Sequence, residues 1–250
     1  MTDKKYLFVV GCPRSGTTAL GLLLAQNPMI LMGIERFGHR AFKNNFSISP
    51  ELFESDRFCD FREGDTFYSG FDFAPKAYAD VVGKLTTATW RGDKIPMMFD
   101  TLPELFGVFG SQAKVIFIFR NIFDVAASYN ARRNNKNDNW HKGTSDAIKD
   151  WNHAISAYRK STAKDQIIPV IYENFFSSPD IARKLHEKLG IANDDMTEEL
   201  VKAMFKRSEV LESERARALS RDEVMEIMLK SNFGGFREIV EISRSLFDIR

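Results

Sequence analysis

The stretch from Tyr6 to Asn27 constrains the fold more than any other part of this sequence. It begins with an aromatic and β-branched run at residues 6–10, which predicts a buried strand. A tight turn with two glycines follows, and residues 17–26 have the leucine spacing of a helix. A strand, such a turn and a helix N-terminus direct backbone N–H groups and the positive end of the helix dipole at one place. The stretch therefore predicts a phosphate-binding loop.

The turn has the G-x-x-x-x-G spacing of a P-loop, from Gly11 to Gly16. Thr17 stands where nucleoside-triphosphate-binding loops have their lysine, so the loop lacks the charge that would reach a β- or γ-phosphate. Arg14 supplies a positive charge from within the loop instead. A plain turn would need only the glycines, whereas this segment also contains Pro13, Arg14, Ser15, Thr17 and Thr18. We predict a phosphate cradle that does not hydrolyse ATP.

Further strand candidates alternate with helices along the chain, at residues 29–33, 89–96, 114–119 and 166–172. The run 114–119, KVIFIF, is apolar enough to be a central strand of a parallel sheet. Helices are predicted at 75–87, 101–109 (capped by Thr101), from 123 onward, at 144–160, 178–189, 197–207 and 220–229, and after Gly234-Gly235. The polar stretch 130–143 is expected to be a connection or lid with Trp140 as its anchor. This alternation predicts an α/β fold, a P-loop NTPase-like parallel sheet flanked by helices, with ligands at the carboxyl ends of the strands.

Length and composition narrow the class of protein. The 250 residues can bury a core without cross-links, and we expect one domain over residues 1–250. The formal net charge of +1 argues against a nucleic-acid-binding coat or a polybasic membrane binder. Cys12 and Cys59 provide no disulfide framework, which favours a reducing compartment. No signal peptide or membrane-spanning run is visible, so we expect a cytoplasmic protein.

Glu35 follows the second strand candidate. A carboxylate at a strand end near a phosphate loop is well placed to accept a proton. The alternative is a glutamate at a helix N-terminus, paired with Arg36 or Arg40. His39, one helical turn further, is the rival base.

Residues 11–18, Gly-Cys-Pro-Arg-Ser-Gly-Thr-Thr, resemble the 5′-phosphosulfate loop of the sulfotransferase family. The donor of that family is 3′-phosphoadenosine 5′-phosphosulfate (PAPS), and the product is 3′,5′-adenosine bisphosphate (PAP). In the tyrosylprotein branch a glutamate 21 residues beyond the loop arginine is the general base, and Glu35 lies 21 residues after Arg14. The tip Asp93-Lys94-Ile95-Pro96 resembles the family's acid-Lys-Thr/Ser-Pro tip, with Ile95 in place of the hydroxyl residue. The resemblance implies that Lys94 contacts the bridging oxygen of the donor.

Arg120 and Ser128, eight residues apart, resemble the family's 3′-phosphate signature. A planar guanidinium and a hydroxyl can hold one phosphate from two sides. Arg132 matches a further arginine of the tyrosylprotein branch, and Tyr172 matches the tyrosine of its V-x-Y-E-x-L segment, which lies near the donor. Family members also fold a basic segment over the 3′-phosphate; the region that corresponds to it here contains Arg215, Arg217, Arg221 and Lys230, without a residue-by-residue match.

The resemblance implies transfer of a sulfuryl group from PAPS to an acceptor hydroxyl or amine, with Glu35 as general base and Arg14 and Lys94 stabilising the transition state. No metal is expected, because two cations replace Mg²⁺ at the leaving group. Two alternatives stay open. An ATP-dependent P-loop kinase would need the absent loop lysine and an acid that binds Mg²⁺, and a non-catalytic nucleotide-binding protein would keep the loop alone. The acceptor is a small molecule, a carbohydrate, a lipid or a peptide, and no nucleic-acid partner is expected.

Overall fold

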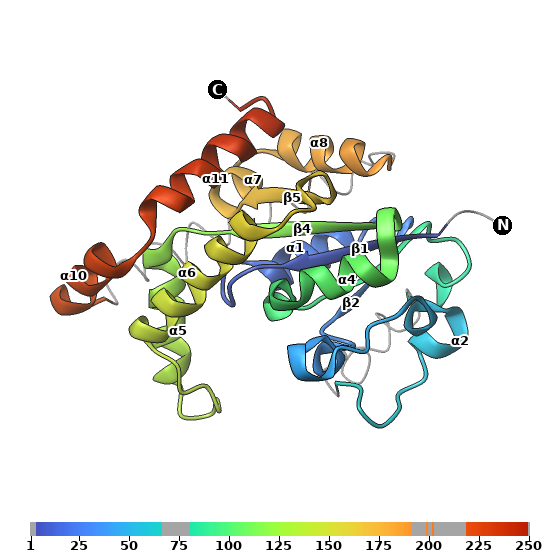
Figure 1. Cartoon of the computed structure of the whole chain (residues 1–250), viewed down its shortest axis with the longest axis horizontal. Helices are drawn as coiled ribbons and strands as arrows, with labels where there is room; N and C mark the ends of the chain where they lie inside the picture. The colour runs from blue at the N-terminus through green and yellow to red at the C-terminus, as the bar shows by residue number, and fades with distance from the viewer. Residues whose placement is uncertain (1–3, 67–80, 192–198, 200–201, 203–218, 250) are drawn as a thin grey trace. The chain divides into compact units, whose positions relative to one another are not determined.

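The computed structural model describes residues 4–66, 81–191, 199, 202 and 219–249 (Figure 1). Within these residues the strands form one five-stranded sheet in the order β2-β3-β1-β4-β5. The pairs β1–β3, β1–β4 and β2–β3 are parallel. The predicted α/β fold with a parallel sheet flanked by helices is confirmed. The strands are β1 (Lys5–Val10), β2 (Ile30–Ile34), β3 (Trp90–Lys94), β4 (Ala113–Phe119) and β5 (Ile167–Ile171).

Helices connect and follow these strands. The α-helices whose bounds lie within the described part are α1 (Thr17–Leu24), α2 (Ser55–Phe58), α4 (Leu102–Phe109), α5 (Ile122–Arg133), α6 (Thr144–Lys160), α7 (Tyr172–Ser177), α8 (Pro179–Leu189), α10 (Arg221–Lys230) and α11 (Phe233–Leu246), and residues 81–84 are also helical. Short 3₁₀ turns lie at Gly38–Ala41, Lys43–Asn45, Pro50–Phe53, Pro96–Thr101, Gly110–Gln112 and Lys164–Gln166. Residues 75–80 of the helix predicted at 75–87, and most of the helix predicted at 197–207, lie outside the described residues. None of the described helices is both long and apolar enough to cross a membrane.

The chain divides into two compact units. The first comprises Met1–Gly11, Thr17–Phe117 and Ser161–Ile168, and the second comprises Cys12–Gly16, Ile118–Lys160 and Pro169–Arg250. The phosphate loop therefore belongs to the second unit, although β1 and α1 on either side of it belong to the first. The expectation of one domain over residues 1–250 stays a prediction.

The first unit is built around β1, whose residues from Tyr6 to Val10 are buried because β3 and β4 flank the strand. The leucines of α1 at positions 20, 23 and 24 are fully buried, as their helical spacing predicts. The sheet register aligns Val9 with Lys94 and Ile34 with Lys94. The carboxyl ends of β1, β2 and β3 therefore lie level at one edge of the sheet.

In the second unit α5 and α6 pack against each other, and α10 packs against both (Figure 1). The predicted apolar stripe of α6 is buried, with Trp151 as its largest member. Asn130 of α5 donates to Glu223 of α10 at 2.7 Å, and Glu223 also closes a capping box with Ser220. A carboxylate near the start of α10 thus ties that helix to its neighbours.

Several predicted boundaries were wrong for local reasons. Helix α5 continues to Arg133, so the first residues of the predicted 130–143 connection are helical. Thr101 occupies the N-cap position of α4, but its side chain makes no cap hydrogen bond, because its one hydroxyl hydrogen is shared between the carbonyls of Ala41 and Met98. The last helix begins at Phe233 and includes both glycines, since the Asn232 side chain accepts from Gly235 N and serves as the N-cap.

Candidate active site

The loop Cys12–Gly16 has a strained backbone. Arg14 has φ +70° and Gly16 has φ +93°, and Ser15 N donates to Cys12 O at 3.0 Å. Among the described residues the non-glycine positions with positive φ are Arg14, Glu35 and Asp248, and two of them are predicted site residues. Such conformations persist where the surrounding structure imposes them, and they concentrate at functional sites. Within the loop Arg14 is exposed, Pro13 is half-buried and Ser15 is buried. Thr17 and Thr18 form the first turn of α1, Thr17 buried and Thr18 exposed.

Arg14 contacts a second predicted anion ligand. Its Nε donates to Ser128 Oγ at 3.0 Å, although the two residues are 114 positions apart. Ser128 lies on the buried face of α5. The second unit therefore brings the loop arginine and the predicted 3′-phosphate serine into direct contact.

Tyr172 links the loop to Arg120. The Arg120 guanidinium carbon lies 4.1 Å from the centroid of the Tyr172 ring, a cation–π contact. A Cβ placed on Gly16 would lie 2.4 Å from Cδ2 of the same ring, so the ring packs against the loop backbone. Trp151 Nε1 donates to Arg120 O at 2.8 Å and fixes the backbone after β4. The loop, Tyr172 and Arg120 are thus neighbours within the second unit.

Arg132 has a partner that the sequence did not reveal. Its Nε and Nη2 donate to the two carboxylate oxygens of Asp138 at 2.6 and 2.8 Å. Its guanidinium also lies 4.6 Å from the centroid of Trp140, which packs edge-on against Tyr129. The predicted anchoring role of Trp140 is confirmed. The contact between Arg132 and a phosphate stays a prediction.

The first unit pairs the predicted base with the predicted lysine. Lys94 Nζ donates to Glu35 Oε1 at 2.5 Å, and Glu35 N donates to Lys94 O at 2.8 Å. The Lys94 side chain is fully buried, whereas that of Glu35 is 38% exposed. Glu35 has φ +57°, so it occupies a left-handed turn directly after β2. The two residues come from neighbouring parallel strands, and the sheet register brings them together.

The alternative interpretation of Glu35 as a partner of Arg36 or Arg40 was wrong. Both arginines bind Asp65, at 2.9 and 2.8 Å, together with Arg57 at 2.7 Å. Burial alone would raise the pKa of Asp65, but the hydrogen bonds from Arg57, Arg40 and Arg36 outweigh it and hold that pKa well below its usual value. The cluster is structural, because its guanidinium groups surround a carboxylate of the chain itself.

His39, the rival base, is exposed and stacks on Phe42, with 6.5 Å between the ring centroids.

Sequence reasoning missed Asp93 as a structural residue. It is fully buried, and its two carboxylate oxygens accept hydrogen bonds from Arg36 N and Phe37 N. The signal that could have identified it is its position inside a predicted strand, because β3 is buried along its whole length and a buried acid needs hydrogen-bond partners. Of the predicted basic segment, Arg215 and Arg217 lie outside the described residues, while Arg221 and Lys230 are the first and last residues of α10.

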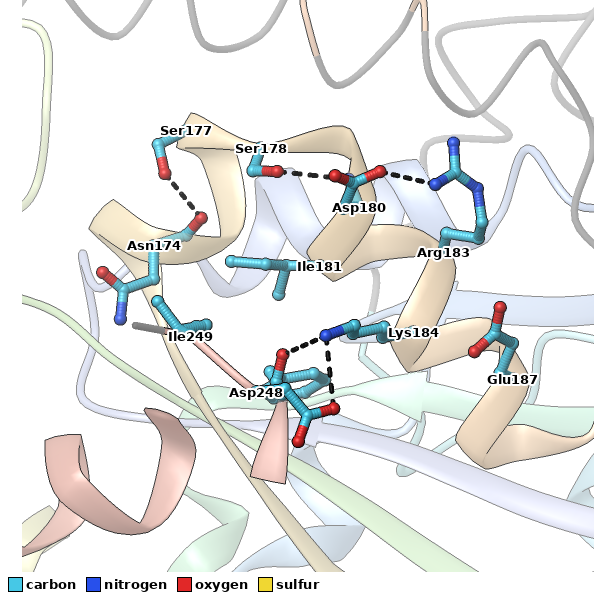
Figure 2. Close-up of a pocket in the computed structure, with 11 residues that line it drawn as sticks. Asn174, Ser177, Ser178, Asp180, Ile181, Arg183, Lys184, Glu187, Asp248 and Ile249 are labelled. Carbon is cyan, nitrogen blue, oxygen red and sulfur yellow. Dashed lines mark hydrogen bonds and ion pairs between the residues drawn. The ribbon is translucent and has the colours of Figure 1, made fainter. Parts of the chain in front are cut away.

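A separate hollow of about 350 Å³ lies in the second unit, between α7, α8 and the chain after α11 (Figure 2). Lys184 Nζ donates to Phe247 O at 2.6 Å, and Arg183 pairs with Asp180 at 2.5 Å. These charged side chains contact other groups of the hollow itself. None of the predicted site residues lines it: the lining residues are Asn174, Ser177, Ser178, Asp180, Ile181, Arg183, Lys184, Glu187, Phe247, Asp248 and Ile249.

The parallel sheet with its loop after β1 defines an α/β protein of the sulfotransferase fold. Residues 7–195 match the model of the sulfotransferase family, which is more than half of the chain. The chain belongs to the sulfotransferase family and is by that membership a transferase. No curated protein matches the sequence significantly.

Solved structures agree on the fold. A sulfotransferase domain from the curacin biosynthetic pathway is 15% identical, with 78% of this chain and 76% of that domain covered and a TM-score of 0.52. A sulfotransferase domain from the olefin synthase of Synechococcus PCC 7002 is 20% identical, with 79% and 77% covered and a TM-score of 0.50. The mouse sulfotransferase SULT7A1, solved in complex with PAP, is 15% identical, with 84% and 66% covered and a TM-score of 0.47. At 15% and 20% identity, the likeness to the first two domains shows the fold alone.

Proposed function

We propose that this protein transfers the sulfuryl group of PAPS to an acceptor hydroxyl or amine and releases PAP. The observation that carries the proposal is the grouping of the loop, Ser128, Tyr172 and Arg120 within the second unit. These residues come from distant parts of the sequence, and each is one that the sequence resemblance assigns to donor binding. The acceptor belongs to one of the classes named above.

The second unit supplies groups that fit a nucleotide with phosphates at both ends. The strained turn at Arg14 and Gly16, with Pro13 and Ser15, shapes a loop whose amides can bind the 5′-phosphate. Thr17 and Thr18 follow the loop directly in the sequence, and we assign their hydroxyls at the N-terminus of α1 to the same phosphate, since the helix dipole favours an anion there. Because Gly16 has no Cβ, the Tyr172 ring can pack directly against the loop backbone. We assign the 3′-phosphate to Arg120, Ser128 and Arg132.

The first unit supplies groups for proton and charge transfer. Glu35 accepts the proton of the acceptor, a role worth about 10²–10⁴-fold in rate. Lys94, whose ammonium is buried beside that carboxylate, stabilises the charge that grows on the bridging oxygen. Arg14, which the second unit supplies, stabilises the sulfuryl oxygens. When bound, PAPS supplies the activated sulfuryl group, so these side chains need only position the acceptor, remove its proton and balance charge.

The experiment compares Glu35→Gln with Glu54→Gln. Glu54 is a matched control, because its side chain is 39% exposed and pairs with Lys4 at 2.5 Å, as Glu35 pairs with Lys94. The protein is incubated with isotope-labelled PAPS and a metabolite extract, and labelled products are counted by mass spectrometry. We expect E35Q to lower turnover about tenfold or more while E54Q keeps it. PAP affinity, measured by calorimetry, should be unchanged in both variants. Near-normal turnover in E35Q would remove Glu35 from the role.

The same calorimetry separates the alternative functions. The proposal expects PAP to bind without Mg²⁺ and far more tightly than ATP, whereas a P-loop kinase would show the reverse order. A non-catalytic nucleotide-binding protein would bind PAP tightly and form no labelled product with any acceptor in the extract.

A further inference from the structure

Asp93 lies one residue before Lys94 in β3 and has no exposed surface. We propose that Asp93 is the positioning residue of this site: its carboxylate holds the turn after β2 in the conformation that directs Glu35 at Lys94. The catalytic consequence rests on the proposed function, but the structural part does not.

The contacts show how the turn is held. Asp93 Oδ1 accepts from Arg36 N at 3.1 Å, and Oδ2 accepts from Phe37 N at 2.7 Å. Glu35 N donates to Lys94 O, so three consecutive amides of the turn are bound by two consecutive residues of β3. The left-handed conformation of Glu35, at φ +57°, is unfavourable for a residue with a side chain and needs such external support.

The space around Asp93 is fitted to a carboxylate. Gly33 pairs with Asp93 in the sheet register, and a Cβ on Gly33 would lie 2.8 Å from Asp93 Oδ1 and 2.9 Å from Arg36 Cβ. A side chain at position 33 would therefore push the carboxylate away from the amides. Glycine at this position and the acid at position 93 act together to keep the turn closed.

Both oxygens accept hydrogen bonds, which favours the ionised form, although burial opposes it. Burial raises the pKa of Asp93 to about 7, against the lowering effect of the two amides and of Lys94, and Glu35 raises it further. The charged groups that act on Asp93 are thus Glu35 and Lys94, and its own charge acts on the Arg36 guanidinium. A residue that needed only to fill space would not require a charge at this depth.

The test is a cycle of Asp93→Asn and Glu35→Gln. An asparagine keeps one acceptor and turns an NH₂ group toward an amide that needs an acceptor. We expect D93N to lower turnover about tenfold, with PAP affinity changed less than about twofold. In the E35Q background we expect D93N to have no further effect on turnover, because Asp93 acts through Glu35. A purely structural role would lower turnover equally in both backgrounds and would overturn the proposal.

Two further measurements keep the inference independent of folding yield and of the function. Gly33→Ala displaces the same carboxylate without changing its chemistry and should also lower turnover, with unchanged PAP affinity. Hydrogen exchange in D93N should show faster exchange of the Arg36 and Phe37 amides. Unchanged exchange of these amides overturns the positioning role whatever the activity. If the unmodified protein does not bind PAP or does not transfer a sulfuryl group, the proposed function is contradicted, but the positioning role of Asp93 in the turn is not.

Discussion

Replacing Gly16 by alanine should destabilise the protein through two separable effects. At φ +93° an alanine adopts a backbone conformation that costs an L-residue roughly 1–2 kcal/mol. Its Cβ would lie 2.4 Å from Cδ2 and 2.7 Å from Cε2 of Tyr172, and relief of such a clash costs roughly 1–3 kcal/mol. The sum is about 2–5 kcal/mol. For a chain of this size that corresponds to a fall of roughly 4–20 °C in the unfolding midpoint.

Two other glycines separate the two effects. Gly190 has φ +68° and ψ +35°, and no atom lies within 4 Å of the place that an alanine Cβ would occupy, so G190A should show the cost of a left-handed backbone alone, about 1–2 kcal/mol. Gly107 lies inside α4 with ordinary φ and open space, and G107A should be neutral or stabilising by up to about 1 kcal/mol. Unfolding is followed by circular dichroism in urea and by heating. A loss in G16A no larger than that in G190A would refute the contact between the loop and Tyr172.

The clash itself is measured by a double-mutant cycle with Tyr172→Ala. Without the ring the new methyl group has room, so G16A should cost about 1–3 kcal/mol less in the Y172A background. An additive cycle would show that the loop and the ring do not touch. The result bears on the proposed function, because the same ring makes the cation–π contact with the Arg120 guanidinium.

Three further outcomes are expected. Asp65→Asn should lower the free energy of unfolding by about 3–5 kcal/mol, because Arg36 and Arg57 stay buried without their carboxylate. Asp60→Asn breaks an exposed pair with Arg62 and should lower it by less than about 1 kcal/mol, so equal losses in urea unfolding would contradict the reasoning. Because the folded-state pKa of Asp65 is depressed, its contribution is complete above about pH 5 and is lost as the pH falls toward that pKa, so thermal midpoints at a series of acidic pH values should fall less in D65N than in the unmodified protein. Besides its role at the sulfuryl group, Arg14 brings a charge to the phosphate loop and a hydrogen bond to Ser128, so Arg14→Ala should weaken PAP binding about tenfold or more in calorimetry without Mg²⁺, while Arg62→Ala leaves the affinity unchanged; equal affinities would remove Arg14 from the donor site.

The sequence was most informative where one local pattern determines structure. The apolar run 6–10, the spaced glycines and the leucines of α1 predicted a strand, a turn and a helix, and each formed close to its predicted bounds. The helix α6 formed at its predicted bounds because its apolar stripe repeats over several turns. Such features depend on neighbours in the sequence, which a single chain displays directly.

Contacts between distant residues could not be predicted in the same way. The Glu35–Lys94 pair depends on β2 and β3 being neighbours in register. The order of the strands in the sheet cannot be inferred from any single segment of the sequence. The partner of Arg132 depends on how the 134–143 connection folds back, and several acids could have served. Thr101 shows the same limit at a helix end, where a hydrogen bond to the distant Ala41 carbonyl takes its hydroxyl away from the cap.

Three acids of the first unit differ in how exposed their carboxylates are and in what those carboxylates contact. Asp65, with a side chain 3% exposed, is surrounded by arginines and serves the fold. Asp93 has no exposed surface and binds two amides, so an acceptor cannot reach it. Glu35 combines a reachable carboxylate with a buried ammonium beside it, and a general base needs both access to the proton and a fixed position. The spacing from Arg14 pointed to Glu35 first, and the exposure of these three carboxylates supports the same choice on independent physical grounds.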